Sequence, residues 1–146
     1  MTFADLLAFA GRNPILSLAL AGLTVAIVAN EVATLLRGYK ALKPAELTAL
    51  MNTIEDAVVV DISPSADFEK GHIAGSRNVQ ASQFGPEHKL VAAARQKPVV
   101  VVCRSGMTAQ GAAKKLKKAG FEQVYVLDGG VAAWRQAELP LVKGRA

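Results

Sequence analysis

The chain has 146 residues, of which 51% are hydrophobic, 5% aromatic and 20% charged, and its formal net charge is +5. This length accommodates one modest domain and one additional segment. The scarcity of aromatic side chains argues against a surface for stacking nucleic-acid bases, and no nucleic-acid-binding motif accompanies the positive charges. We interpret the lysine-rich stretch 114–118 as a solvated helix face, with attraction to anionic lipid as the alternative, and expect no nucleic-acid partner.

The first predicted element is an apolar helix near the amino terminus. Residues 13–30 are 18 consecutive uncharged residues, and the apolar character continues to Leu36. A helix of that length rises about 27 Å, close to the ~30 Å hydrocarbon core of a bilayer. We therefore predict a transmembrane helix over about 13–36, within an N-terminal segment 1–37. A helix buried in a second core and a cleaved signal peptide are the alternatives, although no small-x-small cleavage site precedes Glu31.

Charges on the two sides of this helix predict its orientation. Arg12 is alone on the amino side, whereas Arg37, Lys40 and Lys43 follow the apolar stretch. The positive-inside rule then predicts a single-pass protein of the inner or plasma membrane, with its N-terminus outside and its C-terminal domain in the cytoplasm. A single cysteine, which cannot form an intramolecular disulfide, agrees with a reducing compartment. The lipid bilayer is then a partner, and other membrane proteins are candidate partners.

The remainder of the chain alternates between strand and helix patterns after a short linker over 38–43. We predict strands at 58–61, 76–79, 99–102 and 124–127, and helices at about 44–52, 65–71, 85–94, 109–119 and 131–137. Ser65 is expected to cap the second of these helices. This alternation predicts an α/β fold with a mainly parallel sheet and helices on both faces, preceded by one transmembrane helix.

The only cysteine, Cys103, directly follows the buried valine strand and precedes the helix expected from Ala109. It therefore lies at the carboxyl edge of the sheet, where open α/β sheets bind ligands, and close to a helix N-terminus, which stabilises thiolates and other anions. Arg104 adds a cation, and Gly106 allows a tight turn. A free cysteine is ordinarily a small buried hydrophobe, but these neighbours favour a reactive thiol.

Separated segments of the chain, taken in order, resemble the rhodanese domain, a sulfurtransferase module. Val58–Asp61 is similar to the family's early strand that ends in Asp, and 67–79 is similar to its signature before the cysteine. The loop 103–108 is similar to the family's six-residue active-site loop, and 127–134 is similar to its closing strand, turn and helix. The resemblance covers about 44–142 and implies a rhodanese-like fold there, followed by a tail at 143–146.

The resemblance implies that the Cys103 thiolate takes sulfane sulfur from a small donor and passes it, as a persulfide, to a thiol or cyanide acceptor. Asp61 and His72 are implied as supporting residues, Asp61 through a structural hydrogen bond and His72 by tying the turn 71–75 to the sheet. The catalytic residue would be Cys103, and the residues implied to bind substrate are Arg104, Ser105, Gly106, Met107, Thr108 and Ala109.

Two departures from the family pattern bear on the donor. Ser63 stands where the family often has Arg, and Met107 and Thr108 occupy loop positions that are often polar or basic. With Arg104 as the only cation of the loop, the pattern favours a persulfide over the thiosulfate dianion.

Other classes of protein fit less well. A cysteine phosphatase requires Arg six residues after the cysteine, and Ala109 stands there. A catalytically idle module that binds membrane proteins is the main alternative, and the presence of Cys103 argues against it. The two histidines, His72 and His88, are too few and too far from other ligands to predict zinc. We expect no metal and no cofactor.

Overall fold

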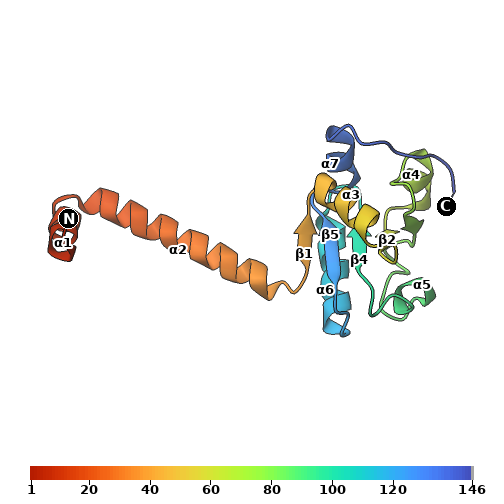
Figure 1. Cartoon of the computed structure of the whole chain (residues 1–146), viewed down its shortest axis with the longest axis horizontal. Helices are drawn as coiled ribbons and strands as arrows, with labels where there is room; N and C mark the ends of the chain where they lie inside the picture. Colours follow the sequence, from red (N-terminus) through yellow and green to blue (C-terminus); the bar gives the residue numbers. More distant parts are fainter. Residues whose placement is uncertain (146) are drawn as a thin grey trace. The chain divides into compact units, whose positions relative to one another are not determined.

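The computed structural model describes residues 1–145 and divides into two compact units, Met1–Arg37 and the segment from Gly38 onward (Figure 1). The first unit contains two helices, α1 (Phe3–Arg12) and α2 (Pro14–Leu36). A capping box between Thr2 and Asp5 starts α1. Pro14 begins α2, and its lack of an N–H costs no hydrogen bond because the first N–H groups of a helix have no acceptor within the helix. The predicted helix over 13–36 is thereby confirmed, whereas α1 was not predicted.

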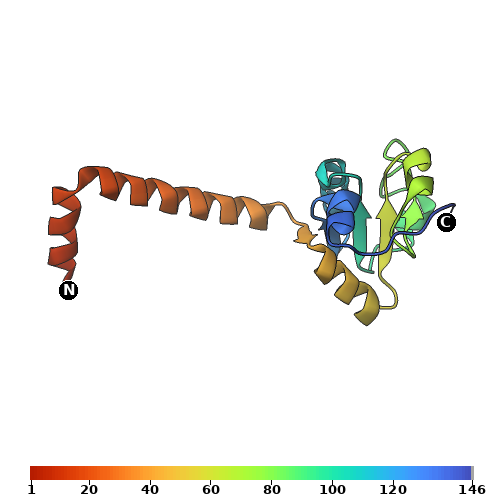
Figure 2. The same cartoon turned by 90° about the horizontal axis from the view of Figure 1, so that it is seen from above.

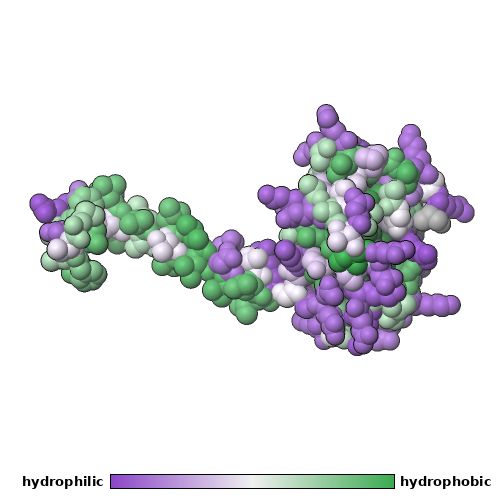
Figure 3. Space-filling model, in the orientation of Figure 1, coloured by the Kyte–Doolittle hydropathy of each residue, from purple (hydrophilic) through white to green (hydrophobic). Residues whose placement is uncertain are grey.

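Both N-terminal helices expose apolar side chains (Figure 3). No residue of α2 is buried, and the helix is long and apolar enough to span a membrane. Its 23 residues correspond to about 34 Å of helix. A helix that is apolar all round has no polar face to turn toward water. Insertion of α2 into a bilayer, and its direction, stay predictions.

The second unit is built on a five-stranded sheet in the order β1-β5-β4-β2-β3, with every neighbouring pair parallel. The strands are β1 (Lys40–Leu42), β2 (Val58–Asp61), β3 (Arg77–Asn78), β4 (Val99–Val102) and β5 (Val124–Leu127). The central strand β4 has four fully buried valines, as expected of a strand covered on both faces. All five carboxyl ends meet at one edge, which positions the site described below.

Helices cover both faces of the sheet, as predicted, with α3 and α6 on opposite sides (Figure 2). Alternate valines of β4 point to opposite faces, because side chains of a strand alternate. One core joins the valines Val99 and Val101 to α5 (Lys89–Ala92) and α6 (Met107–Lys118). The other joins Val100 and Val102 to α3 (Pro44–Thr53) and α7 (Gly130–Gln136). A short helix, α4 (Ser65–Lys70), follows β2.

The predicted linker over 38–43 is wrong. Residues 40–42 form the edge strand β1, which pairs with β5 in the register Leu42 to Leu127. Tyr39 and Leu42 are buried in the two cores. A three-residue edge strand that follows Gly38-Tyr39 has too little alternation to be distinguished from a linker by its pattern.

Several predicted boundaries also differ from the structure. The helix expected over 85–94 is reduced to α5, whose N-cap is His88, and turns precede it. The strand expected over 76–79 is reduced to the two residues of β3. Ser65 does not cap α4, because Pro64 occupies the N-cap and the Ser65 hydroxyl donates to Asn78 Oδ1 at 3.1 Å. The helix expected from Ala109 begins two residues earlier.

Candidate active site

The loop after β4 holds the Cys103 sulfur within its own turn. The Gly106 N–H donates to Cys103 Sγ at 3.0 Å, and Cys103 is only 4% exposed. Gly106 is the N-cap of α6 and has φ +89°, a conformation that favours glycine. The fully buried Ala109 and the valine Val101 belong to the same core as Cys103. The sulfur therefore faces a backbone N–H group at the positive end of a helix, as the sequence predicted.

The turn that leads into α7 contacts the backbone of the cysteine loop. At the start of α7, the Val131 N–H donates to the Cys103 carbonyl at 2.9 Å, and the Ala132 N–H donates to the Arg104 carbonyl at 3.1 Å. Gly130, at φ +62°, makes this approach possible, because a Cβ there would overlap the Cys103 carbonyl oxygen and lie 2.7 Å from the Arg104 carbonyl carbon. The turn that the resemblance implies within 127–134 is therefore present, and its glycine lets the two loops approach each other.

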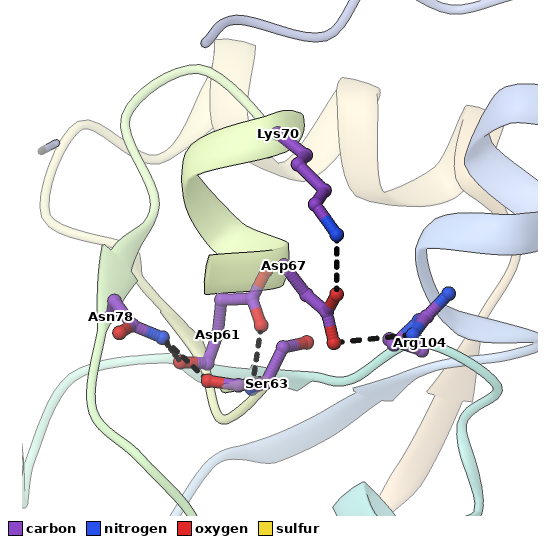
Figure 4. Close-up of polar contacts among 6 residues, drawn as sticks. All are labelled: Asp61, Ser63, Asp67, Lys70, Asn78 and Arg104. Atoms are coloured by element: carbon purple, nitrogen blue, oxygen red, sulfur yellow. Dashed lines mark hydrogen bonds and ion pairs between the residues drawn. The ribbon is translucent and has the colours of Figure 1, made fainter. Parts of the chain in front are cut away.

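Arg104, the residue after the cysteine, forms an ion pair with Asp67. Its Nη1 lies 3.1 Å from Oδ2 of Asp67, and Oδ1 of Asp67 lies 3.8 Å from Nζ of Lys70 (Figure 4). The Arg104 side chain is 72% exposed, so water screens this pair. The sequence predicted Arg104 as a cation beside the sulfur or its anionic substrate. The structure instead gives it a carboxylate partner on α4.

The carboxyl end of β2 contributes two buried polar side chains. Asp61 is 1% exposed, and its Oδ1 accepts the Ser63 N–H at 2.8 Å. Burial raises the pKa of the Asp61 carboxyl above its usual range, and the hydrogen bonding at Ser63 opposes that shift. Asn78 Nδ2 donates to the carbonyl oxygens of Asp61 and Ser63, at 3.0 and 2.8 Å. The Ser63 hydroxyl is buried and has no hydrogen-bond partner among residues 1–145.

His72 has structural contacts that differ from the predicted ones. Its ring stacks on Phe68 with centroids 3.7 Å apart, and its Nδ1 lies 2.8 Å from the Phe68 carbonyl. Its backbone exchanges two hydrogen bonds of 2.9 Å with Val142. His72 therefore ties α4 to the C-terminal segment, and the prediction that it ties the turn to the sheet is wrong.

The remaining loop residues are open to solvent. Ser105, Met107 and Thr108 are exposed, and within residues 1–145 the side chains of Ser105 and Thr108 make no hydrogen bond. These two hydroxyls therefore do not hold the loop in place. No group of three metal-ligating side chains is found in the described part of the chain.

A pocket of about 250 Å³ opens beside Arg104 at the same sheet edge. Its charged and polar lining comes from β2, α4, the cysteine loop and α7: Asp61, Ser63, Asp67, Lys70, Arg104 and Arg135. Sequence reasoning did not select Asp67, Lys70 or Arg135 as site residues. The first two lie inside the signature segment 67–79 and could have been chosen on that basis, whereas no local signal marks Arg135.

A cysteine in a helix-capping loop at the carboxyl edge of a parallel sheet is the arrangement expected of a sulfurtransferase-type α/β domain. Residues 43–137 match the Rhodanese-like domain, which makes this chain a member of the rhodanese-like family. YibN of Escherichia coli strain K12 is 44% identical over 146 residues, covering 97% of this chain and 99% of its own length. The similarity therefore includes the N-terminal helices.

Named enzymes and solved structures agree with this family. The thiosulfate sulfurtransferase GlpE of Pseudoalteromonas translucida is 35% identical over 99 residues, covering 68% of this chain and 91% of GlpE. The crystal structure of a thiosulfate sulfurtransferase from Pseudomonas aeruginosa superposes with a TM-score of 0.64 and 27% identity, over 74% of this chain and 20% of that one. A rhodanese-related protein from Thermoplasma volcanium gives a TM-score of 0.59 at 27% identity, over 71% of this chain and 98% of that one.

Proposed function

We propose that this protein is a membrane-anchored sulfurtransferase that carries sulfane sulfur as a persulfide on Cys103. The observation that carries the proposal is the 3.0 Å contact between the Gly106 N–H and Cys103 Sγ, at the start of α6. A hydrogen bond donated to sulfur, together with the helix dipole, stabilises an anionic persulfide at this position. The family's sulfurtransferases support the same chemistry.

The transfer takes place in two displacements at sulfur. The Cys103 thiolate attacks the outer sulfur of the donor, a new S–S bond forms, and the donor leaves with the electron pair of its broken bond: sulfite from thiosulfate, or a thiolate from a persulfide. An acceptor thiolate or cyanide then attacks the outer sulfur of the Cys103 persulfide. This step forms a new persulfide or thiocyanate and returns the cysteine as a thiolate. The number of electrons and the total charge are unchanged in each step.

The hydrogen bonds between α7 and the cysteine loop, called the brace below, are part of this mechanism. The two hydrogen bonds from α7 to the carbonyls of Cys103 and Arg104 hold the loop while the sulfur changes partners. Preorganised N–H groups stabilise charge without having to reorient during the reaction. Arg104 is paired with Asp67, so a dianionic donor must compete with that carboxylate. This pairing supports a persulfide rather than thiosulfate as the donor.

The anchor is the second part of the proposal. The apolar helix α2 spans the bilayer once, and the three cations after it keep the catalytic domain in the cytoplasm. A catalytically idle module that binds membrane proteins is the competing function. One observation favours it: Met107, on the rim of the loop, is 77% exposed and offers an apolar contact.

Intact mass spectrometry separates the two functions. The full chain in detergent is treated with thiosulfate or with a small organic persulfide and then weighed. We expect the mass of one sulfur atom to be added to the wild-type chain and none to the Cys103→Ser variant. A wild-type chain that gains no sulfur from either donor overturns the sulfurtransferase proposal and leaves the binding module.

A further inference from the structure

The helix α1, which the sequence pattern did not predict, has one apolar face and one polar face. Its charged side chains, Asp5 and Arg12, are seven residues apart and therefore lie on the same side of the helix. The opposite side carries apolar residues at the spacing i, i+3, i+4 and i+7: Phe3, Leu6, Leu7 and Ala10. The three large side chains of this apolar face are between 48% and 76% exposed, so α2 does not cover them.

α1 ends at a corner that hydrogen bonds hold in place, and it does not continue into α2. Asn13, between the two helices, has φ −127° and ψ 66°, which is not helical. Its backbone N–H and its Nδ2 both donate to the Phe9 carbonyl at 3.1 Å. The Ser17 hydroxyl, in the first turn of α2, lies 3.1 Å from the Ala10 carbonyl oxygen and 2.9 Å from that of Asn13. α1 therefore turns away from the axis of α2 and does not lengthen it (Figures 1 and 2).

Side chains of the same segment provide partners for backbone groups at both ends of α1. At its start the Thr2 N–H donates to Asp5 Oδ2 at 2.7 Å, and the Asp5 N–H donates to Thr2 Oγ1 at 3.4 Å. At its end Arg12 Nε donates to the Ala8 carbonyl at 3.2 Å. A backbone polar group without a partner is costly near hydrocarbon, where little water reaches it. These contacts reduce that cost at the ends, where a helix leaves its own backbone groups unpaired.

From these features we infer that α1 lies in the plane of the bilayer surface, with its apolar face at the boundary between headgroups and acyl chains. The inference goes beyond the proposed function and rests on its anchor: with α2 entering the bilayer at Pro14, the single residue Asn13 keeps the end of α1 at that surface. Amphipathic helices of this kind bury their apolar face about 5–10 Å deep. The polar face carries one acid and one base, so the partner is phospholipid in general and not an anionic class.

Spin labels on the full chain in phospholipid nanodiscs test this arrangement. Cys103→Ser removes the only native thiol, and single cysteines introduced into that chain then carry the nitroxide. Collision with oxygen reports immersion in the bilayer, whereas collision with a soluble nickel chelate reports contact with water. We expect the ratio of oxygen to nickel collisions to be several-fold higher for Leu6→Cys and Leu7→Cys than for Ala8→Cys, the matched control on the polar side. The same difference is expected in nanodiscs of zwitterionic lipid and in nanodiscs that also contain anionic lipid.

Three other patterns overturn the inference. A ratio that rises steadily along α1 toward Pro14 means that α1 extends the membrane-spanning helix. High nickel collision at all labelled positions of α1 means that the helix lies in water. Low collision with both reagents at Leu6→Cys and Leu7→Cys means that protein, such as a second copy of the chain, covers the apolar face. A difference between the faces that appears only with anionic lipid refutes the assignment to phospholipid in general.

Failure of the anchor is recognised separately, with labels at Leu20→Cys and Ile27→Cys in α2. Labels there that collide freely with nickel refute the anchor, and the inference falls with it. Labels in α2 that are immersed, together with equal ratios on the two faces of α1, refute only the placement of α1.

Discussion

The contact between the α7 turn and the cysteine loop can be tested with a single methyl group. Gly130→Ala places a Cβ against the Cys103 carbonyl and 2.7 Å from the Arg104 carbonyl carbon and oxygen. These are backbone atoms, so no flexible side chain can move aside. To relieve the overlap, either the turn or the loop must shift, and the two hydrogen bonds at 2.9 and 3.1 Å must lengthen or break.

The cost of this change has two parts. Holding alanine at φ +62° costs about 1–2 kcal/mol, and losing two buried backbone hydrogen bonds costs about 1 kcal/mol each. Together these give a loss of about 3–4 kcal/mol in the free energy of unfolding. For a domain of roughly 100 residues this corresponds to a decrease in Tm on the order of 15 °C. Because the shift passes directly to the loop, we also expect sulfur loading of Cys103 to slow more than tenfold under conditions where the variant remains folded.

The assay is thermal unfolding of the full chain in detergent, followed by near-UV circular dichroism, with sulfur loading followed by mass. Gly111→Ala is the matched control. Gly111 lies within α6 and a Cβ there meets nothing within 4 Å, so this variant should gain about 0.5–1 kcal/mol from helix propensity alone. If Gly130→Ala unfolds within a degree or two of wild type and loads sulfur at the wild-type rate, the brace is not required and this reasoning is wrong.

Four further predictions concern selectivity, stability and location. Asp67→Asn removes the carboxylate that pairs with Arg104, so sulfur loading from thiosulfate should speed up several-fold while loading from a neutral persulfide changes little. Equal acceleration with both donors would point to a shift of the loop instead. A chain that starts at Gly38 should be soluble and folded. A chain that starts at Pro44 lacks β1 and two buried side chains, each of which contributes about 1.5–3 kcal/mol, and it should aggregate on gel filtration. Equal behaviour of the two chains would make β1 dispensable. The raised pKa of Asp61 means that its ionised form destabilises the fold, so Asp61→Asn should raise Tm at pH 7. This gain in Tm should shrink as pH falls through the raised pKa and vanish below about 3.8. A gain in Tm that is independent of pH would contradict this cause. The full chain should stay in the membrane pellet through a carbonate wash, and a reporter at its carboxyl end should behave as cytoplasmic; release by salt or a shortened chain outside the cytoplasm would contradict the anchor.

Much of the fold could be predicted because its strongest signals are local. A run of four valines marks the central strand without any knowledge of its neighbours, and the alternation of strands with helices defines a parallel sheet. The position of Cys103 between such a strand and a helix follows from the same pattern. Edge elements are different: β1 is stabilised by pairing with β5, more than 80 positions away in the chain, and three residues cannot show that pairing in their own sequence.

Only the site residues that belong to the cysteine loop could be predicted from the sequence. Arg104 was expected as a cation near the sulfur because it is next to Cys103 in sequence, but its ion-pair partner, Asp67, is 37 residues away and has no local signal. Ser63 was noticed as a departure from the family pattern, yet only the structure gives its hydroxyl as buried and unpartnered. Arg135 comes to the pocket because α7 packs against the cysteine loop, a tertiary contact with no sequence period.

The enclosure of the cysteine has a kinetic consequence. The chain has one thiol, and Cys103 is 4% exposed. If Cys103 carries a sulfur atom, as we propose, the chain has no second thiol to receive it, and each cycle must finish on a separate molecule. Under the proposed function the acceptor must also be a small ion such as cyanide or a thiol on a slender, protruding group, because a flat protein surface cannot approach an atom so enclosed. Discharge of the loaded protein should therefore be first order in acceptor concentration until binding saturates, with no unimolecular phase.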